Sequence, residues 1–251
     1  MKKLLTILLA AVLFTGCTQT KTADTLTILT SSGYPPFEMV DTNGKLIGFD
    51  IELGEAIAKQ MGYDEVKWVD MDFDGIIGDL NSPTGTGDMS LAGFNAAPDR
   101  GVLFSDAYYN DGKSPYWVLT LAANNWSDGE DLKDKTVGIQ IGTVQAGAVD
   151  LIADDFNLVK DARKDIGQMV QEIINGRIDW ILVDKVVAEE YIASYPQMTT
   201  FELQNEKFTN MSYNAVALPL DSELLDDVNA AIAALKADGQ LDALIAKWFT
   251  E

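Results

Sequence analysis

Histidine is absent from the 251 residues, and cysteine occurs only once, as Cys17. These absences exclude histidine acid–base catalysis, a zinc site built on histidine or cysteine, and an internal disulfide. Basic side chains are scarce, since 18 lysines and arginines stand against 39 acidic residues, for a formal net charge of −21. A field of that sign repels phosphate backbones, so we do not expect nucleic acid as a partner. No motif requires a metal or a cofactor.

Long apolar runs are limited to the N-terminus. Two lysines precede a mostly apolar run over residues 4–14, which is too short to span a bilayer but fits a secretory signal. The run ends at Cys17 and resembles the lipobox of bacterial lipoproteins, although Phe14 replaces the usual Leu, Val or Ile. We therefore interpret residues 1–17 as a lipoprotein signal peptide and lipobox, with Cys17 as the lipidation site. A plain cleaved signal is the alternative, and residues 18–24 are expected to form a tether.

Beyond the tether, short β-like runs alternate with helical patterns. This alternation predicts an α/β fold with mainly parallel strands. Strands are predicted over residues 26–30, 65–69, 89–91, 136–140, 158–160 and 180–183. Helices are predicted over residues 51–61, 73–80, 145–153, 166–174, 185–195, 222–237 and 241–249. Asp50, Asp72 and Asp165 are the predicted N-caps of three of these helices.

The strand-and-helix pattern falls into two blocks of similar size. They separate near residues 113–118 and rejoin near residues 207–213, which are the expected hinge segments. The predicted organisation is one lobe over residues 25–112 and 212–251 and a second lobe over residues 113–211. A chain that crosses twice between two lobes can form a cleft between them.

Several motifs follow one another along nearly all of the mature chain: Gly33-Tyr34-Pro35-Pro36-Phe37-Glu38, Gly48-Phe49-Asp50, Met71-Asp72-Phe73-Asp74-Gly75, Pro98-Asp99-Arg100 and Lys247-Trp248-Phe249. In this order the chain resembles the polar amino-acid-binding family of periplasmic solute-binding proteins of ABC importers. The resemblance implies a two-lobe periplasmic-binding-protein fold, with a mostly parallel sheet flanked by helices in each lobe and a hinge of two crossings.

A free amino acid carries a carboxylate and an ammonium, and a closed cleft must provide a partner for each charge. Arg100 suits the carboxylate, because its planar guanidinium can donate two parallel hydrogen bonds. Thr143 and Val144 lie where a strand ends and a helix begins, and free backbone N–H groups there favour an anion. The resemblance places all three on the ligand carboxylate. The alternatives are a surface arginine and a threonine that only caps its helix.

Asp184 follows the apolar strand 180–183, and ligand sites of α/β folds lie at such strand ends. The resemblance assigns it to the ligand ammonium, with a helix N-cap as the alternative. It also implies that the carbonyls of Ala92 and Gly93 and the side chain of Asn95 complete this subsite. The family usually has Thr or Ser at the position of Asn95, so the subsite departs from the family pattern there.

Aromatic side chains are expected on two sides of the ligand. The resemblance makes Tyr34 and Phe73 the walls of the cleft, and a ring face near an ammonium contributes roughly 0.5 to 2 kcal/mol. Ordinary core packing is the alternative for both. Trp180 lies within a buried strand pattern, and we expect it in the core rather than in the site.

The resemblance implies an extracytoplasmic receptor, lipid-anchored or periplasmic and monomeric, that delivers an amino acid to the permease of an ABC importer. An enzyme is the rival from another class, since some relatives on this scaffold are dehydratases and Glu38 could act as an acid. A complete pair of ligand-charge partners, without a nucleophile and its base, favours binding over catalysis. A sensor domain is disfavoured, because no signalling domain or later membrane span accompanies it.

Ligand specificity depends on the far end of the cleft. Ser31 stands where relatives that bind cationic or amide side chains often have aspartate, and Gln140 stands where some relatives have lysine. These two residues, with Gln145, predict a neutral, polar amino acid, because a charged side chain would lack a partner. A cationic amino acid is the alternative if another carboxylate reaches the cleft, and the candidates are Glu38, Asp70 and Asp72.

Overall fold

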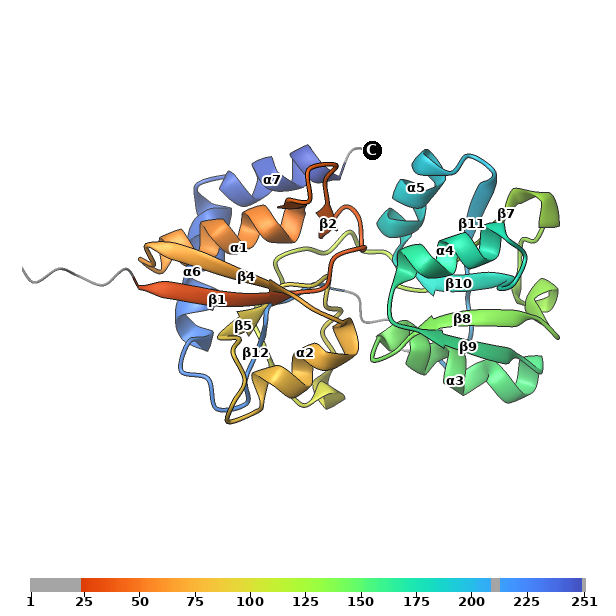
Figure 1. Ribbon diagram of the computed structural model, residues 1–251, viewed down its shortest axis with the longest axis horizontal. Helices are drawn as coiled ribbons and strands as arrows, with labels where there is room; N and C mark the ends of the chain where they lie inside the picture. The colour runs from red at the N-terminus through yellow and green to blue at the C-terminus, as the bar shows by residue number, and fades with distance from the viewer. Residues whose placement is uncertain (1–23, 209–212, 250–251) are drawn as a thin grey trace, which may run out of the picture.

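Two α/β lobes lie side by side in the computed structural model, which describes residues 24–208 and 213–249 (Figure 1). The sheet of lobe 1 has the strand order β4-β1-β5-β12-β6. Its strands are β1 (Thr25–Thr30), β4 (Glu65–Asp70), β5 (Met89–Ser90), β6 (Leu103–Phe104) and β12 (Ala217–Leu218). β1 runs parallel to β4 and β5, whereas β12 is antiparallel to β5 and β6. A short hairpin, β2 (Met39–Val40) with β3 (Leu46–Ile47), precedes the first helix.

Helices cover both faces of this sheet. One group packs together on one side and α2 lies on the other (Figure 1). The group comprises α1 (Phe49–Gln60), α6 (Leu225–Ala237) and α7 (Gln240–Trp248), and α2 spans Phe73–Leu80. A single 3-10 turn, η1 (Pro98–Arg100), follows β5. The sheet is filled from both sides by apolar residues such as Ile28 and Leu29, which are fully buried.

Lobe 2 has the strand order β11-β7-β10-β8-β9. Its strands are β7 (Trp117–Leu121), β8 (Thr136–Gln140), β9 (Val159–Arg163), β10 (Trp180–Val183) and β11 (Met198–Glu202). β8 is parallel to β9 and β10, and β7 is antiparallel to β10 and β11. Helix α3 (Val144–Phe156) lies on one face, and α4 (Ile166–Ile174) and α5 (Lys185–Ser194) lie on the other (Figure 1). Two 3-10 turns, η2 (Ala122–Asn124) and η3 (Gly129–Leu132), complete the lobe.

These elements confirm the predicted two-lobe α/β class, with helices flanking two sheets that each contain parallel strands. The β12 strand returns to the sheet of the first lobe after the whole of lobe 2, so the chain passes between the lobes twice (Figure 1). Trp180 is fully buried in the core of lobe 2, as expected. The predicted hinge segment 207–213 lies partly outside the described residues. The signal peptide with Cys17, and the tether up to residue 23, also lie outside them.

One predicted helix start is wrong. The first helix begins at Phe49 with Gly48 as its N-cap, so Asp50 lies inside the first turn rather than capping it. Gly48 has a φ of 139°, and a Cβ there would approach the carbonyl oxygen of Phe37 to 2.1 Å, so only glycine fits. Asp50 is fully buried, and its carboxylate accepts hydrogen bonds from lobe 1 instead of from its own helix.

The other two predicted caps differ from each other. Asp165 caps α4 as predicted, because its carboxylate accepts a hydrogen bond from the backbone N–H of Gln168 at 2.6 Å. Asp72 occupies the N-cap position of α2 but makes no capping hydrogen bond, and its carboxylate pairs with Lys164 of lobe 2 at 2.6 Å. The Asp72 carboxylate therefore contacts the other lobe instead of capping its own helix.

Candidate functional site

A pocket lies between the lobes, and both lobes contribute to its wall. Lobe 1 supplies the ends of β1 and β5, the start of α2 and the η1 turn. Lobe 2 supplies the end of β8 and the start of α3. All predicted binding residues except Asp184 line this pocket, together with two further side chains: Ser31, Tyr34, Glu38, Phe73, Ala92, Gly93, Asn95, Arg100, Gln140, Thr143, Val144 and Gln145.

These residues converge because of where the strands end. Ser31 directly follows β1, Ala92 lies two residues beyond β5, and Asp184 directly follows β10. The carboxyl ends of neighbouring strands share one sheet edge, and in open α/β folds the ligand site lies outside that edge. Here the two edges face each other, so short segments far apart in the sequence meet in one pocket.

Asp184 does not itself line the pocket; it is 8% exposed and is hydrogen-bonded to three residues that do. Its Oδ2 accepts a hydrogen bond from the Tyr34 hydroxyl at 2.5 Å, and its carboxylate also accepts from Asn95 Nδ2 at 3.1 and 3.3 Å and from Gln145 Nε2 at 3.4 Å. All of these donors are neutral. Burial raises the pKa of Asp184 to about 6 although the three hydrogen bonds oppose the shift. Asp184 therefore lacks a cationic partner among the described residues.

Arg100 is the complementary group on the other side of Asn95. Its guanidinium donates to the carbonyl oxygens of Asn95 and Gly142, at 3.2 and 2.7 Å. The guanidinium also stacks over the rings of Phe94 and Phe73, and its Cζ atom lies 4.6 and 5.4 Å from the respective ring centroids. Burial lowers the pKa of Arg100 to about 10, so the side chain stays protonated at neutral pH.

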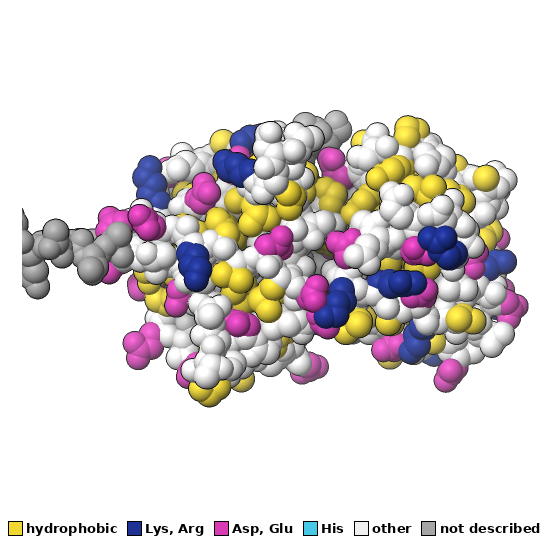
Figure 2. Space-filling model, in the orientation of Figure 1, with side chains coloured by type: hydrophobic (Ala, Val, Ile, Leu, Met, Phe, Trp, Pro, Cys, Tyr) yellow, Lys and Arg dark blue, Asp and Glu magenta, His cyan; other side chains and the backbone are white. Residues whose placement is uncertain are grey.

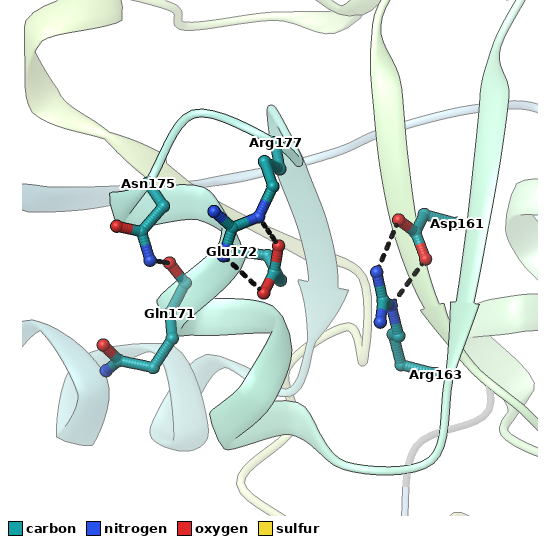
Figure 3. A network of polar contacts seen from close by, with 6 residues as sticks. All are labelled: Asp161, Arg163, Gln171, Glu172, Asn175 and Arg177. Atoms are coloured by element: carbon teal, nitrogen blue, oxygen red, sulfur yellow. Dashed lines mark hydrogen bonds and ion pairs between the residues drawn. The ribbon is translucent and has the colours of Figure 1, made fainter.

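The chain's two other arginines each form an ion pair with an acidic side chain, whereas Arg100 forms none with the described residues. Arg163 pairs with Asp161 at 2.7 Å, and Arg177 pairs with Glu172, both on lobe 2 (Figure 3). No carboxylate of the described residues lies within ion-pair distance of Arg100. The pocket is thus lined by a guanidinium without an anion, and the residues of its wall hold the carboxylate of Asp184 without a cation.

The start of α3 adds to the positive side of the pocket. Thr143 is the N-cap of this helix, and its hydroxyl accepts from the Ala146 N–H at 3.1 Å and donates to the Gln140 carbonyl at 2.8 Å. The capping role that the sequence left as an alternative is therefore present. The N-terminus of α3 lies beside Arg100, whose guanidinium contacts Gly142, and a helix N-terminus favours a bound anion.

Glu38 is the pocket residue whose environment the sequence did not predict. It is fully buried, and neither of its oxygens has a donor from a basic, amide or hydroxyl group of the described residues. Burial, and then the charge of Asp50, raise the pKa of Glu38 well above its ordinary range. The residue comes from the Tyr-Pro-Pro-Phe-Glu motif, whose turn pairs Tyr34 with Glu38 as a β-bridge.

The comparisons with known proteins agree with this architecture. The family model of the bacterial extracellular solute-binding proteins, family 3, matches residues 26–251. The chain belongs to this family. Its members are binding proteins, so an enzyme on the same scaffold is not supported.

Two relatives of this family 3 chain are similar over their whole length. The arginine-binding extracellular protein ArtP of Bacillus subtilis (strain 168) is 33% identical, over all of this chain and 99% of that protein. The ABC transporter arginine-binding protein 1 of Escherichia coli (strain K12) is 31% identical, over all of both chains. A solved structure of an ancestral arginine-binding protein bound to arginine superposes with a TM-score of 0.80, at 35% identity, over 90% of this chain and 98% of that one.

Several contacts join the two lobes of this family 3 protein directly. Lys164 of lobe 2 pairs with Asp72 of lobe 1, and the Tyr191 hydroxyl donates to the Gly33 carbonyl at 2.9 Å. Figure 2 shows the lobes meeting along a seam where acidic and basic side chains adjoin. Together with the bonds from Tyr34 to Asp184, these contacts define a closed arrangement of the lobes.

The residues that the sequence offered as specificity determinants differ in whether they face the pocket or are engaged by other residues. Ser31 is 8% exposed and lines the pocket, but the side-chain amide of Gln140 donates to the Lys164 carbonyl at 2.9 Å. Asp70 is held by the backbone and hydroxyl of Ser32 and does not line the pocket, and Asp72 is engaged by Lys164. Of the three candidate carboxylates, only Glu38 reaches the pocket.

The described residues contain no cluster of acidic side chains suited to holding a metal ion. Within residues 24–208 and 213–249, no helix combines the length and the apolar character needed to cross a membrane.

Proposed function

We propose that this protein captures one free amino acid between its lobes and delivers it to the permease of an ABC importer. The observation that carries the proposal is an opposite pair of charges: Arg100 lines the pocket, and buried Asp184 is hydrogen-bonded to the pocket residues Tyr34, Asn95 and Gln145. Neither has a partner of opposite charge among the described residues. The ligand carboxylate would bind Arg100 and the start of α3, and the ligand ammonium would bind Asp184. Both buried charges are then neutralised in one step, which favours a zwitterion over a simple anion or cation.

The ring faces of Tyr34 and Phe73 support this role. Phe73 lines the pocket while it also packs on Phe94 with ring centroids 4.8 Å apart, so the wall is held by the core of lobe 1. Tyr34 lines the pocket and is tied to Asp184 across the lobes. A rigid wall positions the ligand without a further loss of side-chain entropy.

For the ligand side chain, the contacts favour the cationic alternative over the neutral, polar amino acid that Ser31 and Gln140 predicted. Gln140 already has a backbone acceptor in lobe 2. Glu38 lines the same pocket as a buried carboxyl and has no cationic partner. We therefore propose that a cationic side chain, such as that of arginine, reaches Glu38. The names of the arginine-binding relatives support this choice.

We also propose that Cys17 carries a lipid anchor that holds this extracytoplasmic receptor at the membrane, and that it acts as a monomer. This proposal rests on the apolar run and its terminal cysteine in the sequence. The tether of residues 18–24 would then separate the lobes from the bilayer.

A calorimetric panel tests the proposed function. The mature protein is titrated with arginine, lysine, glutamine, serine and glutamate, and we expect one site with arginine or lysine tightest, at a Kd of about 1 μM or below, near −8 kcal/mol. The Glu38→Gln variant, a neutral side chain of similar size, should lose affinity for the cations and keep its affinity for glutamine. Tightest binding of glutamine or serine by the parent would restore the neutral ligand. Absence of binding by every amino acid would overturn the proposed function.

A further inference from the structure

Two carboxyl groups lie together beneath the pocket, at Glu38 and Asp50. Both residues are fully buried, and three of their four carboxyl oxygens, Glu38 Oε1, Glu38 Oε2 and Asp50 Oδ1, have no donor from the described residues. Both lie against Gly93, since a Cβ at that glycine would stand 3.5 Å from Glu38 Oε1. Two neighbouring carboxyl groups that are buried without a cation between them cannot both be ionised, so one of the two holds a proton. The pair adjoins Gly93 of the pocket wall, whose N–H donates to Asp50 Oδ2 at 2.8 Å.

The surroundings decide which group holds the proton. Asp50 Oδ2 accepts from the Gly93 N–H and also from the Tyr108 hydroxyl at 2.8 Å, and both bonds favour its charged form. Glu38 receives no such donor from the described residues. The proton therefore resides on Glu38, and its O–H can point at the second oxygen of Asp50, Oδ1, which otherwise has no donor among the described residues.

The charges around the pair oppose a second negative charge. The titratable groups that act on Glu38 or line the same pocket come from β4, α1, the start of α5, the Tyr-Pro-Pro turn and the loops after β5 and β6: Asp70, Asp50, Asp184, Tyr34, Arg100 and Tyr108. Arg100 is the one cation in this set, and in the proposed function the ligand carboxylate occupies it. Ionisation of Glu38 therefore needs a positive charge that the ligand brings.

We propose that Asp50 is a positioning residue for ligand specificity, which keeps a proton on Glu38 until a cationic ligand side chain displaces it. This inference rests on the proposed function and adds a regulation of the same site. When the cation binds, the Glu38 O–H bond breaks, the proton passes to the solvent buffer, and the carboxylate pairs with the ligand. A neutral amide ligand instead accepts a hydrogen bond from protonated Glu38, and no proton leaves.

Titration calorimetry in buffers of different ionisation enthalpy measures how many protons are released when each ligand binds. At pH 6.5 we expect the parent to release about one proton per arginine bound and none per glutamine bound. The arginine affinity should then rise about tenfold per pH unit while the pair stays protonated, by linkage. In Asp50→Asn, the amide can donate to Glu38, which ionises before the ligand arrives, so proton release and pH dependence should both be lost. Asp226→Asn, at an exposed position of α6, is the matched control and should behave as the parent.

A second variant keeps the test decisive if Asp50→Asn fails to fold. Tyr108→Phe removes one donor from Asp50, so the pair should hold its proton more tightly. The rise of arginine affinity with pH should move to higher pH, while the count of about one proton is retained. Arginine binding by the parent without proton release, at an affinity that does not vary with pH, would overturn this inference and leave amino-acid capture intact. Absence of any amino-acid binding would instead overturn the proposed function.

Discussion

Replacing Asp184 with asparagine should affect folding and binding in opposite directions. Asp184 is 8% exposed, and burial raises its pKa from an ordinary 3.8 to about 6. Between these values the folded ligand-free protein binds the proton more strongly than the unfolded chain does. Its stabilising contribution is therefore complete below about pH 4 and is lost as the pH rises through about 6. Asparagine has no such titration.

The size of the effect follows from the shift. A difference of about two pKa units corresponds to about 3 kcal/mol, which is an upper bound on the stability lost through Asp184 between acid and neutral pH. Asparagine also places an amide N–H among the donors Tyr34, Asn95 and Gln145, but that mismatch is the same at every pH. Comparing the pH dependence of the two proteins therefore isolates the ionisation of Asp184. For binding, the loss of the ammonium's partner should cost roughly 2 to 5 kcal/mol, or about 30- to 5000-fold in Kd.

Urea unfolding at pH 4.5 and 7.5, without ligand, measures the first effect, and titration calorimetry with the tightest amino acid at pH 7.5 measures the second. We expect the free energy of unfolding to fall less with pH in Asp184→Asn than in the parent, and the ligand to bind far more weakly. An equal pH dependence of unfolding together with a Kd within threefold of the parent would refute the assignment of Asp184 as a buried charge that receives the ligand ammonium. Asp226→Asn again serves as an exposed control.

Three further variants test other parts of the molecule. Arg100→Ala should raise the Kd by about 30-fold or more, whereas Arg177→Ala, which removes a surface arginine, should leave it unchanged in the same calorimetric titration. Cys17→Ser should move the full-length protein from the membrane to the soluble fraction of fractionated cells, and continued membrane association would contradict lipidation at this residue. Lys164→Ala removes the exposed contact with Asp72 between the lobes, and because such pairs contribute about 0 to 1 kcal/mol, the Kd should rise by no more than about fivefold. A larger rise would show that this contact governs closure.

The sequence predicted the fold well because its apolar periodicities agree with the observed elements. The strand over 136–140 and the helix capped by Asp165 have the predicted bounds, since both depend on local patterns. The start of α1 was wrong because the conformation of Gly48 is imposed by the turn that precedes it. Asp50 had the composition of a cap but is buried against Tyr108, a contact between residues 58 positions apart.

The position of the candidate site could be predicted to the extent that it lies at strand ends. Asp184 follows directly from the end of β10, and Thr143 from the turn between β8 and α3. The specificity residues were less predictable, because their roles depend on contacts between distant segments. Gln140 is engaged by the backbone at Lys164, and Glu38 is buried against Asp50 by the docking of its turn on α1. Neither contact could be predicted from a periodic pattern in the sequence, because each joins segments that are distant along the chain.

The contacts between the closed lobes bear on the proposed function, because a ligand that binds Asp184 must displace them. Tyr34 and Asn95 of lobe 1 donate to Asp184 of lobe 2, so these hydrogen bonds hold the lobes together and satisfy the carboxylate with neutral groups. An ammonium ligand competes for the same oxygens, and its binding free energy is the difference between a charge-assisted contact and the neutral ones it replaces. Among the described residues, the hydrogen-bond acceptors of Arg100 are likewise neutral carbonyl oxygens. A ligand with one charge would neutralise one of these two side chains and leave the other buried and unpaired, whereas a zwitterion neutralises both. Under the proposed function, this pairing of charges is what selects amino acids.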